Sequence, residues 1–288
     1  MPASPSLFEP VVPPEPLFGP GGADGPLTTP ETWLPTELSR GPWDPGALHG
    51  GPVAALAARA IERSTAAWPA PGHIVRLTLE LLRPVPVAPL TVTAAVTRPG
   101  RKVQIIEGAV TAGDQEVARH RAVRLRVEPE LHVPGGDRSE RGAPAPFPGP
   151  DEAAPADGFR GAYRGFHNAG AELRIARGGI AERGPSAVWV RLAVPVVPDE
   201  VPSPFQRTVA AADFGNGVSS VLPPDRYTFI NPDLTVFCSR PAVGQWVAVE
   251  ASTTLGVPGV GLARSVLWDT GSPEPIGQAV QCILVEGR

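Results

Sequence analysis

The chain has 288 residues, enough for one large domain or two ordinary ones, and a formal net charge of −4 at pH 7. Since it has no block of Lys and Arg residues, this balance argues against a nucleic-acid partner. Its two cysteines, Cys238 and Cys282, are too few for a disulfide framework, which indicates a reducing, cytoplasmic location. No apolar run approaches a membrane span, and the histidines and cysteines lack metal-ligand spacing. We therefore expect neither a membrane segment nor a metal site.

The N-terminal part of the chain is expected to form one helix and several strands. Residues 1–30 are rich in Pro and Gly, which predicts an arm that lies on the surface or is partly disordered. A short strand is expected over 32–38, followed by a loop and by a helix that begins at Gly51-Pro52 and runs to about residue 64. Runs rich in Val, Ile, Leu and Thr, separated by turn signals, predict strands near 73–82, 89–98, 102–112 and 115–127. The aperiodic stretch 129–160 is expected to be a linker.

The C-terminal part repeats this plan. Strands are expected near 171–176 and 187–194, a helix over 203–213, and further strands near 229–239, 245–254, 259–268 and 275–285. The clearest internal match is Leu77-Thr78 followed by Arg83-Pro84, which recurs 157 residues later as Leu234-Thr235 and Arg240-Pro241. The prolines that begin the two helices lie 152 residues apart. A helix followed by four antiparallel strands, present twice, predicts a duplicated α+β domain.

One residue of the second helix breaks its apolar pattern. Residues at helical spacing form one stripe, namely Phe205, Thr208, Val209, Ala212 and Asp213. In the first helix the position equivalent to Asp213 is Ile61, so only one of the two helices carries an acid on this face. A buried carboxylate is costly unless it has partners, which makes Asp213 the first candidate for chemistry. The alternative is a residue that only caps a bend, because Gly215-Asn216-Gly217 follows.

Short motifs in a fixed order link the chain to a known family. The N-terminal part contains the Gly50-Gly51 helix start, Leu82-Arg83-Pro84 and Arg98-Pro99-Gly100-Arg101. The C-terminal part contains Phe166-His167-Asn168, Ala212-Asp213-Phe214, Asp233 ahead of Arg240-Pro241, and Gln278-Ala279-Val280-Gln281. In these features the chain resembles the acyl-CoA thioesterase II family of double hot-dog proteins. The resemblance implies an α+β fold, a tandem double hot-dog with two curved antiparallel sheets, each wrapped around a central helix. Its hot-dog domains are expected over residues 31–128 and 161–288.

The resemblance also implies an activity and its catalytic residues. Members of that family hydrolyse acyl-CoA thioesters with a water that an Asp, a Thr and a Gln orient and activate. The Asp matches Asp213 and the Gln matches Gln281. The Thr position, two residues before Asp233, is occupied here by Asn231, whose amide can donate or accept a hydrogen bond but has no hydroxyl. We therefore expect an enzyme that needs no cofactor, acts on acyl-CoA, and forms a homodimer by analogy with its relatives.

Substrate-binding residues are expected at the start of the first helix. Backbone N–H groups at Gly50 and Gly51 are suited to stabilise an oxyanion, because glycine permits close approach and the helix dipole favours negative charge. His49 directly precedes them, and this His-Gly-Gly sequence resembles that of many hot-dog thioesterases, which implies that His49 binds or polarises the thioester carbonyl. Trp43, in the preceding loop, is a further candidate for substrate contact, against the alternative that it belongs to the core.

Two other functions remain open on the sequence. Asp44 and His49 have the spacing of the proton-transferring dyad of (R)-specific enoyl-CoA hydratases, although the residues between them, Pro45-Gly46-Ala47-Leu48, lack the Asn-Pro element of that group. The other alternative is a non-catalytic double hot-dog protein that only binds acyl-CoA, which is suggested by Asn231 in place of Thr.

Overall fold

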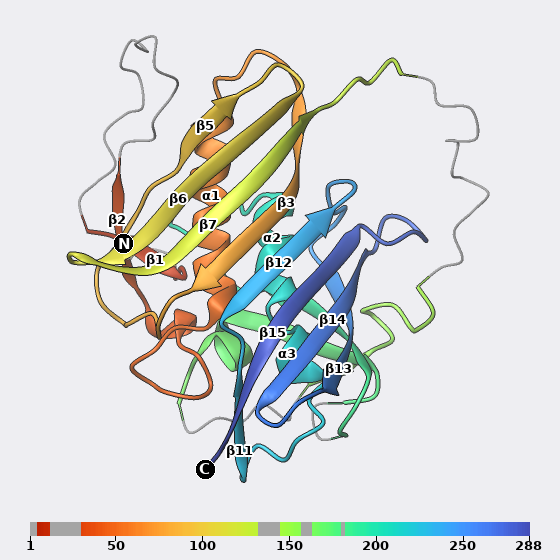
Figure 1. Ribbon diagram of the computed structural model, residues 1–288. Helices are drawn as coiled ribbons and strands as arrows, with labels where there is room; N and C mark the ends of the chain where they lie inside the picture. The colour runs from red at the N-terminus through yellow and green to blue at the C-terminus, as the bar shows by residue number, and fades with distance from the viewer. Residues whose placement is uncertain (1–4, 12–29, 132–144, 157–162, 180–181) are drawn as a thin grey trace.

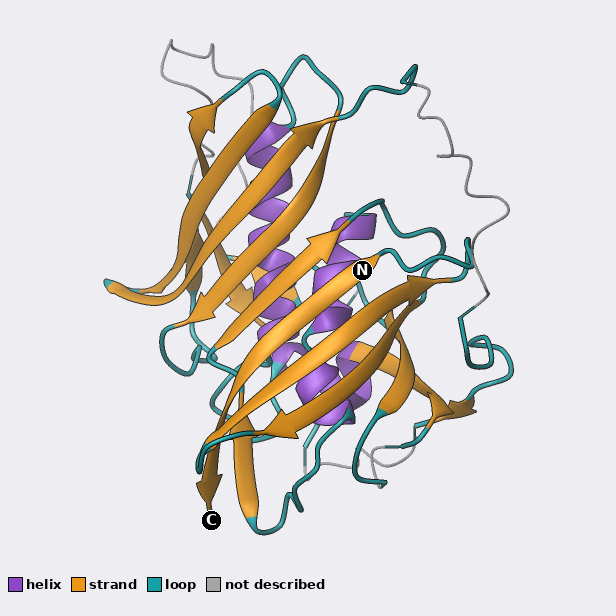
Figure 2. Ribbon diagram, turned by 45° about the vertical axis from the view of Figure 1, so that its right-hand side comes forward, coloured by secondary structure: helices purple, strands orange, loops and turns teal. Residues whose placement is uncertain are grey.

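The computed structural model of the protein describes residues 5–11, 30–131, 145–156, 163–179 and 182–288. Within these residues the strands form one 15-stranded antiparallel sheet. Its main path runs β1-β2-β4-β6-β7-β3-β12-β15-β14-β13-β10-β9-β8, with β5 paired to β6 and β11 paired to β15. The helices lie on one side of this sheet (Figures 1 and 2). No helix of the described residues is long and apolar enough to cross a membrane.

The N-terminal half of the sheet packs on helix α1 (Gly50–Thr65). Its strands are β2 (Glu31–Pro35), β3 (Gly72–Leu81), β4 (Leu90–Val92), β5 (Ala95–Pro99), β6 (Val103–Ala112) and β7 (Gln115–Arg126). The apolar stripe predicted for this helix is buried, with Leu56 and Ile61 fully enclosed. Ala54, Ala55 and Ala58 are buried as well, because the helix contacts the sheet on one side and a second helix on the other. Small alanine side chains allow this close helix–helix approach.

The C-terminal half repeats this arrangement around α2 (Pro204–Ala212), which packs against α1. A short helix, α3 (Gly215–Val218), follows at once. The strands of this half are β9 (Ala171–Arg177), β10 (Ser186–Leu192), β11 (Tyr227–Ile230), β12 (Asp233–Cys238), β13 (Val247–Leu255), β14 (Val260–Asp269) and β15 (Gly277–Gly287). The segments expected near 89–98 and 229–239 are each split into two strands. In the second case the break falls at Asn231-Pro232, where proline cannot donate to the strand ladder.

The two halves join through β3 and β12, which run antiparallel side by side (Figure 1). Thr78 lies opposite Thr235, and the Thr235 hydroxyl donates to that of Thr78 over 3.2 Å. These are the two threonines that the internal repeat equates. Their direct pairing is what a local two-fold relation between the halves requires. The same relation places the end of each helix beside the start of the other.

The first residues of the chain differ from the surface arm expected over 1–30. Leu7 and Phe8 are fully buried, and β1 (Phe8–Pro10) pairs with β2. The N–H groups of Leu7 and Phe8 donate to the carbonyls of Pro195 and Val196, which belong to the C-terminal half. Two adjacent apolar residues carry no periodicity, so this contact could not be predicted from the amino-acid pattern. The rest of the expected arm, residues 12–29, lies outside the described residues.

Part of the stretch expected to be a linker over 129–160 packs on the C-terminal sheet. β8 (Ala154–Pro155) pairs with β9, and Phe147 packs edge-on against Trp189 and Trp268. The indole N–H of Trp189 donates to the Pro148 carbonyl. A single aromatic residue anchors this segment, which is too short to show a hydrophobic period. Residues 132–144 and 157–160 of the same stretch lie outside the described residues.

Candidate active site

Asp213 occupies the C-terminal end of α2. The helix begins at Ser203, whose hydroxyl accepts a hydrogen bond from the Gln206 N–H over 3.1 Å, and at Pro204 in the first helical position. It ends at Asp213, whose side chain is only 3% exposed. The acid at the end of the apolar stripe is therefore inside the protein, where a carboxylate needs partners.

Two side-chain amides donate to this carboxyl group. The Nδ2 of Asn231 lies 2.9 Å from Asp213 Oδ1, and the Nε2 of Gln281 lies 3.1 Å from the same oxygen. The orientation of the Gln281 amide is fixed, because its Oε1 accepts from the backbone N–H of Asn216 over 3.0 Å. The structure thus brings the three expected catalytic side chains together. Since a carboxylate only accepts hydrogen bonds, two donors on one oxygen match an ionised Asp213.

The third partner of Asp213 comes from the other half of the chain. His49 is the N-cap residue of α1, and its Nδ1 lies 2.8 Å from Asp213 Oδ2 and 3.1 Å from the N–H of Gly51. One ring nitrogen cannot donate to the carboxylate and accept from the amide at once. With Asp213 ionised, Nδ1–H donates to the carboxylate, while the Gly51 N–H points at the same ring nitrogen. The sequence did not reveal that His49 contacts Asp213.

The two glycines at the start of α1 are required by close packing. A β-carbon on Gly50 would lie 2.8 Å from Asp213 Oδ2, and one on Gly51 would lie 2.7 Å from the Ala210 carbonyl oxygen. Contacts this short do not occur with real β-carbons, so a side chain at either position would push the two helices apart or displace the carboxyl group. Glycine lets the start of α1 lie directly against the end of α2.

The rings of Phe166 and Phe214 pack against the ring of His49. The His49 ring lies 5.1 Å from Phe166 and 4.8 Å from Phe214, measured between centroids, and the two phenylalanines stack on each other at 5.3 Å. Both are fully buried or nearly so. Neither was expected to belong to the site, although each stands in a motif that carries the family resemblance. Neighbouring His167 is neutral at pH 7, because burial and then the charge of His49 lower its pKa to about 4.

Trp43 and Asp44 make other contacts. Trp43 packs edge-on against Phe229, 4.8 Å between centroids, beside a small apolar cluster. The Oδ1 of Asp44 accepts from the Gly46 N–H over 2.7 Å, on the surface of its own turn. In the described part of the chain, no hydrogen bond, ion pair or ring contact joins Trp43 or Asp44 to Asp213, and the acid partner of His49 is Asp213. The Asp44–His49 dyad of the hydratase alternative is therefore not formed.

Across the described ranges, no group of three or more His, Cys, Asp and Glu side chains is arranged to hold a metal ion. The arrangement offers a buried carboxylate, a histidine in contact with it, two amide donors, and a glycine-rich helix start. These are the parts that acid–base chemistry at a carbonyl group requires.

Comparisons with known proteins identify the family of this chain. The sequence model of the acyl-CoA thioesterase N-terminal domain matches residues 39–125, and that of the acyl-CoA thioesterase C-terminal domain matches residues 139–285. A comparison with curated proteins gives no match.

Solved structures share the fold at low sequence identity. A protein of Alicyclobacillus acidocaldarius with a hot dog fold has a TM-score of 0.67 at 16% identity, over 93% of this chain and 96% of that chain. A protein of Novosphingobium aromaticivorans has a TM-score of 0.66 at 20% identity, over 89% and 96%. The acyl-CoA thioesterase II TesB2 of Mycobacterium marinum has a TM-score of 0.57 at 16% identity, over 84% and 91%.

Proposed function

We propose that this chain, a thioester hydrolase that belongs to the acyl-CoA thioesterase family, cleaves acyl-CoA to a free acid and coenzyme A with a water molecule that Asp213 activates. The observation that carries the proposal is the Asp213 carboxyl group, enclosed where the two halves meet and contacted by His49, Asn231 and Gln281. We assign the architecture as a tandem double hot-dog, with domains over 31–128 and 161–288, and we expect cytoplasmic fatty acid metabolism as its setting.

In the proposed reaction, Asp213 acts as the general base. The carboxylate takes a proton from water as the oxygen of that water bonds to the thioester carbonyl carbon, which forms a tetrahedral oxyanion. The oxyanion then collapses, the carbon–sulfur bond breaks, and the coenzyme A thiolate recovers the proton from Asp213. The backbone N–H groups of Gly50 and Gly51 at the positive end of α1 are the proposed oxyanion donors, and the Gly51 N–H becomes available when the His49 ring turns away from it.

The amides of Asn231 and Gln281 hold the base rather than the water in this proposal. Both donate to Asp213 Oδ1, which directs Oδ2 toward His49 and Gly50. Asn231 reaches the carboxyl oxygen at 2.9 Å, so an amide can orient the base at the position where the family has Thr. This geometry favours a catalytic protein over one that only binds acyl-CoA.

The test is thiol release from a series of acyl-CoA chain lengths. The purified protein should release coenzyme A, and Asp213→Asn, which keeps the shape but loses the base, should lower kcat by roughly 10²–10⁴-fold. Asp225→Asn, at an exposed position, serves as the matched control and should keep full activity. Absence of thiol release at every chain length, or Asp213→Asn activity within a few-fold of the parent, would refute the proposal.

We also expect a homodimer. Light scattering behind size-exclusion chromatography measures this directly, and a monomer at micromolar concentration would contradict it.

A further inference from the structure

The internal repeat defines a second location equivalent to the Asp213 site, at the other end of the helix pair. Ile61 of α1 corresponds to Asp213 of α2, and Ile74 of β3 corresponds to Asn231, 157 residues later. Both counterparts are aliphatic and buried. The second location therefore lacks an acid at the position of the proposed base.

The third counterpart is apolar as well. Gln281 lies one residue beyond the partner of Thr235 on β15, and Ala122 lies one residue beyond the partner of Thr78 on β7. Since Thr235 and Thr78 are equivalent, Gln281 corresponds to Ala122, which is fully buried. At the second location, apolar side chains thus stand in place of the three polar side chains of the Asp213 site.

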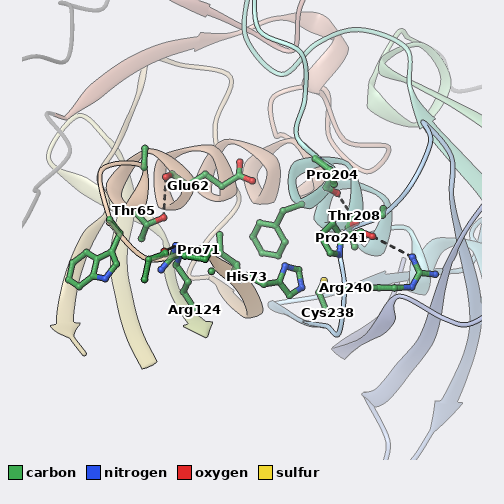
Figure 3. A pocket seen from close by; sticks show the side chains of 17 residues that line it. Glu62, Thr65, Pro71, His73, Arg124, Pro204, Thr208, Cys238, Arg240 and Pro241 are labelled. Atoms are coloured by element: carbon green, nitrogen blue, oxygen red, sulfur yellow. Dashed lines mark hydrogen bonds between the residues drawn. The ribbon is translucent and has the colours of Figure 1, made fainter. Parts of the chain in front are cut away.

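A cavity of about 400 Å³ opens at this second location (Figure 3). It lies between the C-terminal end of α1, the start of β3 and the start of α2, and its apolar lining includes Trp68, Ile74 and Phe205. The 16 residues of α1 separate it from the Asp213 site by about 24 Å at 1.5 Å per residue. None of the side chains around Asp213 lines it.

One buried cation, the Arg124 guanidinium, faces this cavity. The Arg124 residue is only 9% exposed, and its guanidinium donates to two neutral acceptors, the Gln104 amide oxygen and the Ala70 carbonyl, each over 2.8 Å. In the described part of the chain it forms no ion pair with a carboxylate, and burial lowers its pKa. Gly72 lies against the guanidinium, where a β-carbon would collide with it. A buried charge held in this way is costly unless an anion joins it.

The other polar groups of the cavity are already engaged or neutral. Glu62 accepts from the Ser203 hydroxyl and the Gln206 amide, and burial raises its pKa. Arg240 forms a two-point ion pair with Asp269.

Two further groups on this wall carry no charge at neutral pH. Burial raises the pKa of the Cys238 thiol to about 12 and lowers that of His73. Among the described residues that line the cavity, Arg124 is therefore the cation without a carboxylate partner. The cavity thus suits a single negative charge beside an aliphatic chain.

We infer that this cavity binds an aliphatic monocarboxylate, with the carboxylate on the Arg124 guanidinium and the chain against Trp68, Ile74 and Phe205. A guanidinium pairs with a carboxylate through two parallel N–H donors, which gives the head group its orientation. The acid released by the proposed reaction belongs to the same chemical class. Binding here does not involve Asp213, so this inference and the proposed hydrolysis stand or fall separately.

Calorimetric titration of the full-length protein with octanoate tests the site. Octanoate should bind, and Arg124→Gln should weaken the binding at least 10-fold. Arg121→Gln, on the outer face of the same strand with a side chain 53% exposed, is the matched control and should bind like the parent, as should Asp213→Asn. Octan-1-ol, which has the same chain without the charge, should bind the parent and Arg124→Gln equally. In parallel, octanoate should change the tryptophan fluorescence of the parent but not of Trp68→Phe.

A second variant tests the inference if Arg124→Gln does not fold. Ala66 is exposed at the rim of the cavity, so Ala66→Trp should fold and should block octanoate binding. The inference is overturned if octanoate does not bind the parent at millimolar concentration. It is also overturned if a folded Arg124→Gln or Ala66→Trp binds octanoate as tightly as the parent, because the carboxylate then lies elsewhere.

Discussion

The carboxyl group of Asp213 determines what its neighbours can be. Its Oδ1 needs donors, which Asn231 and Gln281 supply, and its Oδ2 lies against Gly50 at a distance that admits no side chain. The identity of residue 50 is thus tied to a residue of the other half, 163 positions later in the sequence. A site assembled from two halves in this way responds to substitutions at both.

Gly50→Ala tests this dependence. The new methyl group would lie within 3.0 Å of three atoms of the Asp213 carboxyl group, so the carboxyl group must move away from His49. We expect kcat to fall at least 10-fold while the protein stays folded, since sub-ångström to ångström displacements of a catalytic group carry costs of this order. Gly256→Ala is the control, because a β-carbon there meets no atom within 4 Å. Thiol release at the parental rate in Gly50→Ala would contradict the assignment.

A buried arginine of helix α1, Arg59, forms ion pairs with both halves of the molecule. Arg59 is 2% exposed and donates from Nε and a terminal nitrogen to Glu200 over 2.7 and 2.6 Å. It also pairs with Glu31 of β2 and lies over the Trp33 ring at 4.9 Å. Burial alone would lower the Arg59 pKa, but the hydrogen bond to Glu200 and the charges of both glutamates outweigh it and raise the pKa. The helix therefore carries a cation into the core only because two carboxylates from opposite halves meet it there.

Arg59→Ala should unfold more readily than the parent by about 3–5 kcal/mol, the usual cost of removing one partner from a buried ion pair. Urea denaturation followed by circular dichroism measures this difference. The comparison is Arg177→Ala, whose side chain is 44% exposed in its pair with Glu250, and which should cost no more than about 1 kcal/mol. Equal losses in the two variants would show that the buried ion pairs of Arg59 add no more stability than an exposed pair.

The whole molecule combines a nearly symmetric scaffold with unequal ends. The paired threonines at the β3–β12 junction mark the local two-fold relation between the halves. One end of the helix pair carries the acid, whereas the other has a cavity lined by Arg124, which forms no ion pair with a carboxylate of the described residues. Its stability also depends on histidines that are buried uncharged in both halves. Burial lowers the pKa of His120 on β7 to about 4, opposed in part by the Thr93 carbonyl.

Stability should therefore fall as the pH drops below 6.5. His120 and His167 titrate near 6.5 in the unfolded chain but near 4 in the folded one, so the unfolded chain gains protons first. Each should lower the free energy of unfolding by roughly 1–2 kcal/mol between pH 7 and pH 5. Urea titrations at the two pH values measure the fall, and His120→Gln should reduce it without abolishing it. An unchanged pH dependence in that variant would rule out His120 as a contributor.

Much of this protein follows from its sequence alone. Apolar periods and turn signals located α1, α2 and most strands to within a few residues, because the spacing of apolar residues follows from which side of a helix or strand is buried. The break in one such period singled out Asp213, and short motifs added Gln281, Asn231 and the glycines of α1. Only the tertiary structure decided that His49 pairs with Asp213 and that Leu7 and Phe8 are buried. It also decided that Arg124 is buried with no carboxylate of the described residues beside it. Each depends on chain segments distant in sequence, and periodicity records only which side of an element is buried, never which partner buries it.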